Sequence, residues 1–151
     1  MDKKLIGEAI QALELIDIYL YTTSVKRFKE ISSDHYPDEM AQQNKIAIDA
    51  EFLEAKSERN TGRLINAKVE FGARYIVEEN DDEVTAYAEI EACFIAKYSL
   101  SKDISEEAIS EFMKFNVVHN IWPFWREHAF RLSAQAKLPT PIISLYKSTS
   151  E

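Results

Sequence analysis

The sequence predicts an α+β domain in which a four-stranded antiparallel sheet, ordered as a meander, is followed by two helices that pack on one of its faces. Two observations indicate this class. Between residues 15 and 100, apolar and polar side chains alternate in four stretches, which is typical of antiparallel strands with one buried face. Beyond residue 105, apolar side chains recur at every third or fourth position, which is the spacing of helices. The 151 residues suit a single domain over 1–151 with its own core.

A short helix and a strand are expected to open the chain. Residues 5–15 carry apolar side chains at steps of four and three, which predicts the helix. From Leu15 to about Arg27 apolar residues alternate with polar ones, with Ile16, Ile18 and Leu20 on one side, which predicts the strand. The following segment, residues 30–44, is polar and contains proline, so we expect a loop.

Three further strands follow. The second is expected to begin near Lys45 and to place on one side Ile46, Ile48, Ala50 and Phe52. A hairpin turn is predicted at residues 60–62, and the acidic run 78–83 is expected to be a solvated loop. The third strand gives an apolar face of Ile65, Ala67, Val69, Phe71, Ala73, Tyr75 and Val77. The fourth, from Val84 to Leu100, is long and rich in alanine on its apolar face, which favours pairing between subunits.

Two helices are predicted after the sheet. Ser105 suits an N-cap, and the helix that it begins is expected to reach about Val118. Asn120 is expected to cap a second, longer helix with Pro123 in its first turn, where the missing amide proton costs nothing. This helix should end near Lys137. Its apolar stripe includes two residues that we expect in the core, Ile121 and Trp125.

The composition excludes several classes of function. A net charge of -8 gives no support for nucleic-acid binding, and no apolar run approaches the roughly 20 residues that span a bilayer. The single cysteine, Cys93, allows no intrachain disulfide and fits a cytoplasmic protein. With three glycines, the chain has no phosphate-binding loop and no nucleophile elbow. We therefore expect neither an enzyme nor a cofactor.

The stretch Trp122-Pro123-Phe124-Trp125-Arg126-Glu127 resembles the aromatic-Pro-aromatic-x-Arg-Glu motif that opens the long helix of SecB-like export chaperones. In that family a second proline follows twelve positions after the glutamate and leads into an apolar extended segment, as Pro139 does here. The motif resemblance covers residues 118–146, and the order of strands and helices extends it to most of the chain. It implies a SecB-like, ATP-independent holdase that binds unfolded polypeptides as a homotetramer, a dimer of dimers.

The resemblance leaves the partner open. In SecB, acidic residues of the first strand engage the zinc-binding tail of SecA, the export motor, to which preproteins are delivered. The stretch from Tyr21 to Lys26 carries no acidic residue here. Relatives include chaperones attached to toxin–antitoxin systems and proteins of phage, so a dedicated chaperone of one partner, such as an antitoxin, is the alternative to SecA delivery. A third hypothesis is a hot-dog-like domain that binds or hydrolyses a small molecule.

A holdase needs accessible apolar grooves rich in aromatic rings, because rings bury a large area with few rotatable bonds. The resemblance places client grooves between the sheet and the helical layer, with the candidate contact residues Trp122, Phe124, Ile142, Leu145, Tyr146, Phe71, Tyr75 and Phe94. Each of these has the alternative of a core position or a subunit contact.

Two charged residues of the motif and the histidines near it have structural interpretations. Arg126 is expected to form a structural ion pair, and Glu127 with Arg131 an i,i+4 surface pair. His119, Glu127 and His128 match no zinc-ligand spacing, so no metal site is expected.

Overall fold

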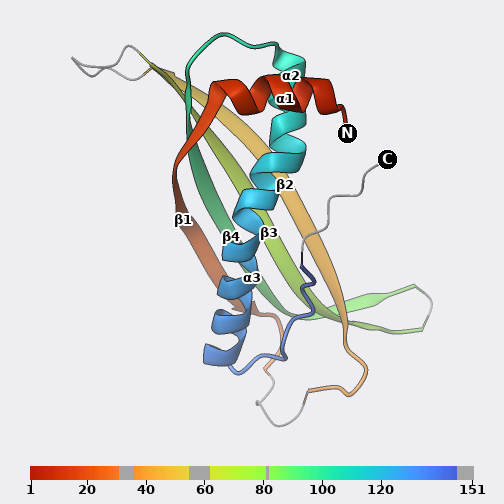
Figure 1. Cartoon of the computed structure of the whole chain (residues 1–151). Coiled ribbons are helices and arrows are strands. Elements are labelled where there is room, and N and C mark those ends of the chain that lie inside the picture. Colours follow the sequence, from red (N-terminus) through yellow and green to blue (C-terminus); the bar gives the residue numbers. More distant parts are fainter. Residues whose placement is uncertain (31–35, 55–61, 81, 146–151) are drawn as a thin grey trace.

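The computed structural model describes residues 1–30, 36–54, 62–80 and 82–145. It confirms an α+β fold in which one twisted antiparallel sheet carries all of the helices on one face, with the opposite face bare (Figure 1). Two of the sequence expectations fall on residues outside the described ranges: most of the hairpin turn at 60–62, and Tyr146.

The elements lie close to their expected positions, although β2 begins four residues before Lys45, inside the expected loop. In order they are α1 (Lys3–Ala12), β1 (Leu13–Arg27), β2 (Ala41–Glu54), β3 (Arg63–Glu78), β4 (Val84–Leu100), α2 (Glu106–Phe112), the π-helical turn η1 (Met113–Val117) and α3 (Val118–Gln135).

The strand order is β1-β4-β3-β2, so the expected meander is wrong for the first strand. Strands β2, β3 and β4 form a meander, whereas β1 pairs with β4 at the far edge. The connection from β1 to β2 therefore crosses from one edge to the other, past the C-terminal end of α3. There the Tyr36 hydroxyl donates a hydrogen bond to the Lys137 carbonyl, at 2.7 Å.

Three β-bulges interrupt the regular alternation of side chains. In β1 the register shifts at Ile16 and Tyr21, and in β4 it shifts at Tyr87. Because each extra residue moves the following side chains to the other face, the expected grouping of Ile16 with Ile18 and Leu20 is wrong. The apolar face of β4 runs regularly from Ala88 to Leu100, as expected.

The expected break between the two C-terminal helices is also wrong. Val117 and Val118 both have right-handed helical dihedrals, so α2, η1 and α3 form one continuous helical run. Asn120 caps nothing; its side-chain amide donates to the Tyr98 hydroxyl at 2.9 Å. Pro123 lies inside α3, where it removes one backbone hydrogen bond. Burial of this helix face against the sheet outweighs that loss.

The core lies between α3 and the two central strands, β3 and β4. Ile121 and Trp125 are buried, as the helical stripe predicted. The Trp125 ring stacks on Phe71 of β3, with centroids 5.3 Å apart and planes within 9°. At the other end of the sheet α1 packs against α2, and Asp2 caps α1 by accepting hydrogen bonds from two backbone amides.

Candidate functional site

The helical layer covers the centre of the sheet and leaves the helix-side face of the edge strand β2 open. The helix α3 contacts β4 and β3, and the short turn η1 contacts β2. Consequently three apolar residues of β2 remain accessible, Ile46 at 47%, Ile48 at 38% and Phe52 at 60%. Their pairing partners on β3 share the same face and are fully buried. We call the channel between β2 and the helices the β2 groove.

In the described part of the chain, no segment fills the half of the β2 groove near α2. It holds a cavity of about 350 Å³, whose apolar walls are Ile48, Ala50 and Phe52 from the strand and Ile109 and Met113 from the helices. Its polar lining consists of Asp49, Glu106 and Ser110. An apolar floor with a polar rim is the composition of a surface that binds apolar side chains. We call this part the open half.

The other half of the groove is filled by the end of the chain, residues 138–145, which we call the strap. It runs in extended conformation between α3 and β2 (Figure 1). Ile143 points inward and is 7% exposed, whereas Ile142 and Leu145 are 82% and 71% exposed. Thus the two candidate contact residues of the strap, Ile142 and Leu145, lie at the surface.

Side chains from three elements hold the strap by its backbone. From α3, the Trp122 indole nitrogen donates to the Ser144 carbonyl and the Arg126 Nε donates to the Ile143 carbonyl, each at 2.8 Å. From β2, the Gln42 carboxamide donates to the Ile142 carbonyl at 3.0 Å and accepts from the Ile142 amide at 2.7 Å.

The hydroxyl of Tyr75 on β3 fixes the start of the strap. It donates to the Pro139 carbonyl at 2.6 Å. Burial raises the pKa of Tyr75 to about 12, so this hydroxyl keeps its proton and remains a donor at any physiological pH.

A larger cavity, of about 700 Å³, lies on the outer side of α3 beside the last described residues of the strap. Trp122, Phe130 and Leu145 form much of its apolar lining. The Arg126 guanidinium lies over the Phe130 ring, 4.7 Å from its centroid, so Arg126 makes a ring contact and a carbonyl hydrogen bond in place of the expected ion pair. The expected pair of Glu127 with Arg131 is confirmed, at 2.9 Å.

The remaining candidate contact residues separate into surface and core. Phe124 is 47% exposed, and because it lies two positions from Trp122 on the helix, it faces away from the groove. Phe71, Tyr75 and Phe94 are buried in the core. Phe71 nevertheless lines the small cavity that Ile46 shares with the strap, whereas Tyr75 reaches the strap through its hydroxyl.

Sequence reasoning missed the residues that shape the open half and the strap contacts. The alternation places Ile48 and Phe52 on one face of the second strand, but nothing in the pattern shows that the helices leave this face of β2 exposed. Gln42 fell in the expected loop. No local signal could have found Gln42, because it lies one hundred residues from Ile142 in the sequence and only the fold brings the two together.

One buried histidine of α3 is tied to β1. The Nε2 atom of His128 lies 2.8 Å from the hydroxyl oxygen of Thr23. That hydroxyl donates its proton to the Glu91 carbonyl. Since that hydroxyl has one proton, the imidazole must donate through Nε2. Burial, aided by Arg131 and opposed by Glu127, lowers the pKa of His128. Among the described residues, no group of three His, Cys, Asp or Glu side chains lies close enough to hold a metal ion.

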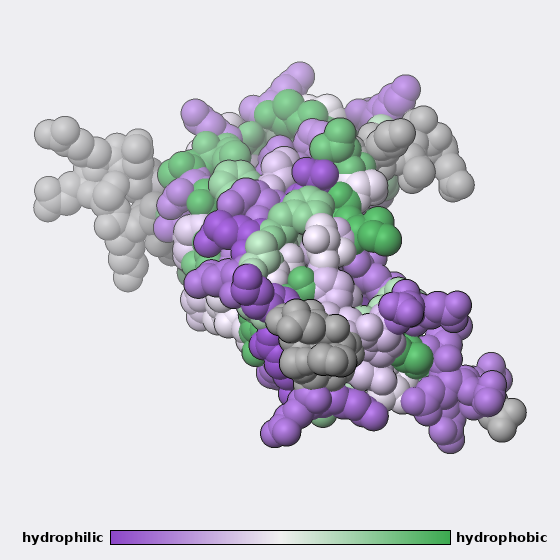
Figure 2. Space-filling view, turned by 90° about the horizontal axis from the view of Figure 1, so that it is seen from below, coloured by the Kyte–Doolittle hydropathy of each residue, from purple (hydrophilic) through white to green (hydrophobic). Residues whose placement is uncertain are grey.

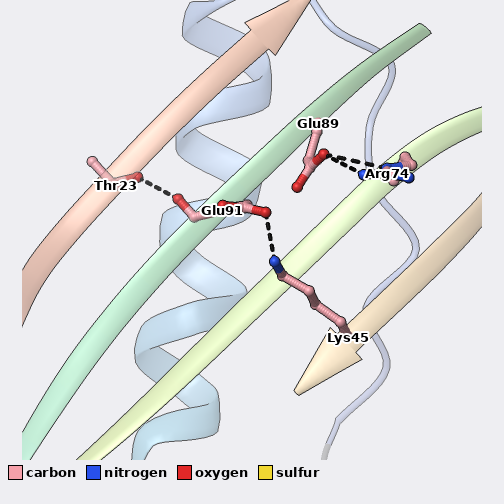
Figure 3. A network of polar contacts seen from close by, with 5 residues as sticks. All are labelled: Thr23, Lys45, Arg74, Glu89 and Glu91. Carbon is pink, nitrogen blue, oxygen red and sulfur yellow. Dashed lines mark hydrogen bonds and ion pairs between the residues drawn. The ribbon is translucent and has the colours of Figure 1, made fainter. Parts of the chain in front are cut away.

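The bare face of the sheet carries two ion pairs between neighbouring strands (Figure 3). Arg74 on β3 donates from Nε and Nη2 to the buried carboxylate of Glu89 on β4, at 3.2 and 2.9 Å. Lys45 on β2 lies 2.6 Å from the Glu91 carboxylate, and this hydrogen bond raises the pKa of Lys45. The carboxylates of Glu89 and Glu91 are therefore already paired with cations.

The view from the end of the molecule beside the C-terminus of α3 shows apolar patches separated by polar ones (Figure 2). Within the described part of the chain, no helix is long and apolar enough to cross a membrane.

Comparison with known proteins identifies the architecture. No protein-family model matches the sequence, and no curated protein matches it. Among solved structures, a SecB-like chaperone of Mycobacterium tuberculosis, in complex with a ChAD peptide from the HigA1 antitoxin, is similar with a TM-score of 0.74. The alignment covers 98% of this chain and 100% of that chain, at 12% sequence identity. The resemblance drawn from the helix motif is thus confirmed at the level of structure: this chain adopts the fold of a SecB-like chaperone.

Proposed function

We propose that this protein is an ATP-independent holdase chaperone that binds non-native polypeptides in the β2 groove. The observation that carries the proposal is the exposed apolar face of β2, where Ile48 and Phe52 line a cavity walled by α2 and η1. Binding of this kind breaks no bond. It requires only that apolar segments of a client exchange water for the groove.

The magnitude of the exposed surface is adequate for reversible binding. At roughly 25 cal/mol per Å² of apolar area, covering a few large side chains contributes several kcal/mol before the cost of association is subtracted. A holdase that must release its client needs this moderate affinity. The net charge of -8 keeps the protein soluble while a client is bound.

We also propose that the protein assembles into the homotetramer that the SecB-like resemblance implies, in the cytoplasm. The edge strand β1 supports this. It presents a free strand edge with five exposed large apolar residues: Leu15, Ile16, Tyr19, Leu20 and Tyr21. An exposed apolar edge of this length favours pairing with another subunit.

The second candidate is a dedicated chaperone of one partner, such as an antitoxin. The similar Mycobacterium tuberculosis protein is bound to an antitoxin peptide. The paired carboxylates of the bare face and the absence of acidic residues in the stretch from Tyr21 to Lys26 favour this candidate over delivery of preproteins to SecA.

Two assays test the proposal and separate the candidates. Light scattering of a reduced, unfolding client at a one-to-one ratio should show suppressed aggregation for a general holdase. A pull-down from the cells that produce the protein should recover many polypeptides in that case, and one stoichiometric protein if the partner is dedicated. Failure to suppress aggregation of any client and to retain any polypeptide would contradict both candidates.

A further inference from the structure

We infer that the strap is a displaceable internal occupant of the β2 groove, and that a client segment competes with it for the same contacts. The inference rests on the proposed function and specifies how its site is regulated. The ligand class is an extended polypeptide with a branched aliphatic side chain at the position of Ile143.

The strap is bound in the way a peptide ligand is bound. The side chains of Gln42, Trp122 and Arg126 all bond to its main chain, on Ile142, Ser144 and Ile143 respectively. Hydrogen bonds to backbone groups are available from any polypeptide, so these contacts do not depend on the sequence of the occupant. Selectivity is left to the inward side chain, which here is Ile143.

The position of the strap makes it a competitor. It lies against Ile46, which lines a small cavity together with Ile142, Ile143 and Trp122. Ile46 and Ile48 share one face of β2, and Ile48 lines the open half. The filled and open halves are therefore one channel, and a client that follows β2 from the open half meets the strap within two residues.

The strap is weakly anchored beyond its first residues. Leu138 is buried and Pro139 is held by Tyr75, which fixes the start of the strap. Further along, only Pro141 and Ile143 are buried, whereas Ile142 and Leu145 point to solvent and contribute almost no apolar burial. Hydrogen bonds that water can replace on release contribute little net free energy, so residues 140–145 can detach without unfolding the sheet.

Tethering explains why such a weak contact still matters. A segment attached at Pro139 has an effective concentration at the groove on the order of millimolar. An untethered client must compete with the strap at this effective concentration. Removal of the strap should therefore strengthen client binding by about tenfold or more.

The decisive comparison uses Ile143→Ser with Ile142→Ser as its matched control. Both substitutions shorten a branched side chain of the strap and leave the groove residues unchanged. The first removes the inward anchor and the second alters a side chain that is already in water. The probe is a fluorescent peptide with the sequence of residues 139–151, read by anisotropy, with circular dichroism to confirm that each variant is folded.

We expect the peptide to bind Ile143→Ser at least about tenfold more tightly than it binds the unaltered chain or Ile142→Ser. A chain that ends after Thr140 should behave like Ile143→Ser, and it keeps the comparison open if the substituted chain is unfolded. Equal affinity for all folded variants, or no binding to any of them, would overturn the inference.

The aggregation assay separates this inference from the proposed function. If the unaltered chain suppresses aggregation and Ile143→Ser does so equally well, the strap is a fixed wall of the groove and the holdase proposal stands. If the peptide binds as expected but none of the variants protects a client, the strap is displaceable and the holdase proposal fails.

Discussion

On the helix side of the sheet, β2 exposes three large apolar residues, whereas on the opposite side two ion pairs join β2, β3 and β4. Ile46 and Phe52 represent the first group, and Lys45, Arg74 and Glu89 the second. Two cations of the opposite side, Lys45 and Arg74, lie against the carboxylates of Glu91 and Glu89. The strap lies against Ile46, whereas Phe52 lines the open half of the groove. Apolar exposure on the helix side suits the binding of an apolar segment, whereas the ion pairs on the opposite side already engage each other.

The first prediction tests whether the helix side holds the fold together. Trp125→Ala removes a buried ring that stacks on Phe71, so we expect the free energy of unfolding to fall by about 3–5 kcal/mol. Urea titration followed by far-ultraviolet circular dichroism measures the change. Phe124→Ala, one residue away and half exposed, is the matched control and should cost less than about 0.5 kcal/mol. Similar losses for the two variants would contradict the assignment of core and surface on α3.

The second prediction tests the internal pairing of the bare face. Arg74→Met leaves the carboxylate of Glu89 buried without its cation, which should cost about 1–3 kcal/mol of stability. Arg131→Met breaks the exposed pair with Glu127 and should cost at most about 0.5 kcal/mol. An equal loss of stability in the two variants would contradict the claim that the pair of Arg74 with Glu89 is a buried internal contact.

The third prediction concerns His128, whose pKa is lowered by burial. Its ordinary pKa is about 6.5, and the folded protein binds the proton less readily than the unfolded chain does. The stability from neutral His128 is therefore complete above about pH 6.5 and is lost as the pH falls toward the lowered pKa. Unfolding free energies measured from pH 7.5 to 5.5 should decline, and less steeply in His128→Gln. His119→Gln should retain the decline; a decline unchanged in His128→Gln would show that another group causes it.

The elements that local patterns determine could be predicted from the sequence. Strand β4, its buried face and the apolar stripe of α3 follow from the spacing of apolar residues. The pair of Glu127 with Arg131 follows from helical geometry. The place of β1 beside β4 could not be predicted, because it depends on a crossover rather than on the strand itself. The helix continued through Pro123 because its packing on the sheet outweighs one lost hydrogen bond.

The candidate site was predicted only in part, for a related reason. The alternation of apolar and polar residues shows which face of each strand is apolar, but it does not show which strands of the sheet the helices cover. Phe71 and Phe52 have the same parity relative to the helices, yet the first is buried under Trp125 and the second is exposed. How far the helical layer extends across the sheet determines which of the two residues is buried, and this extent cannot be predicted from the sequence pattern.

The most direct test of the comparison uses two adjacent residues of β2 on opposite faces. Phe52→Ser removes an exposed ring from the open half, and Leu53→Ser makes a similar change on the bare face. Aggregation of an unfolding client is followed by light scattering while each folded variant is titrated. We expect Phe52→Ser to require several times more protein than the unaltered chain, and Leu53→Ser to match the unaltered chain. Equal protection by Phe52→Ser, or an equal loss with Leu53→Ser, would contradict client binding in the β2 groove.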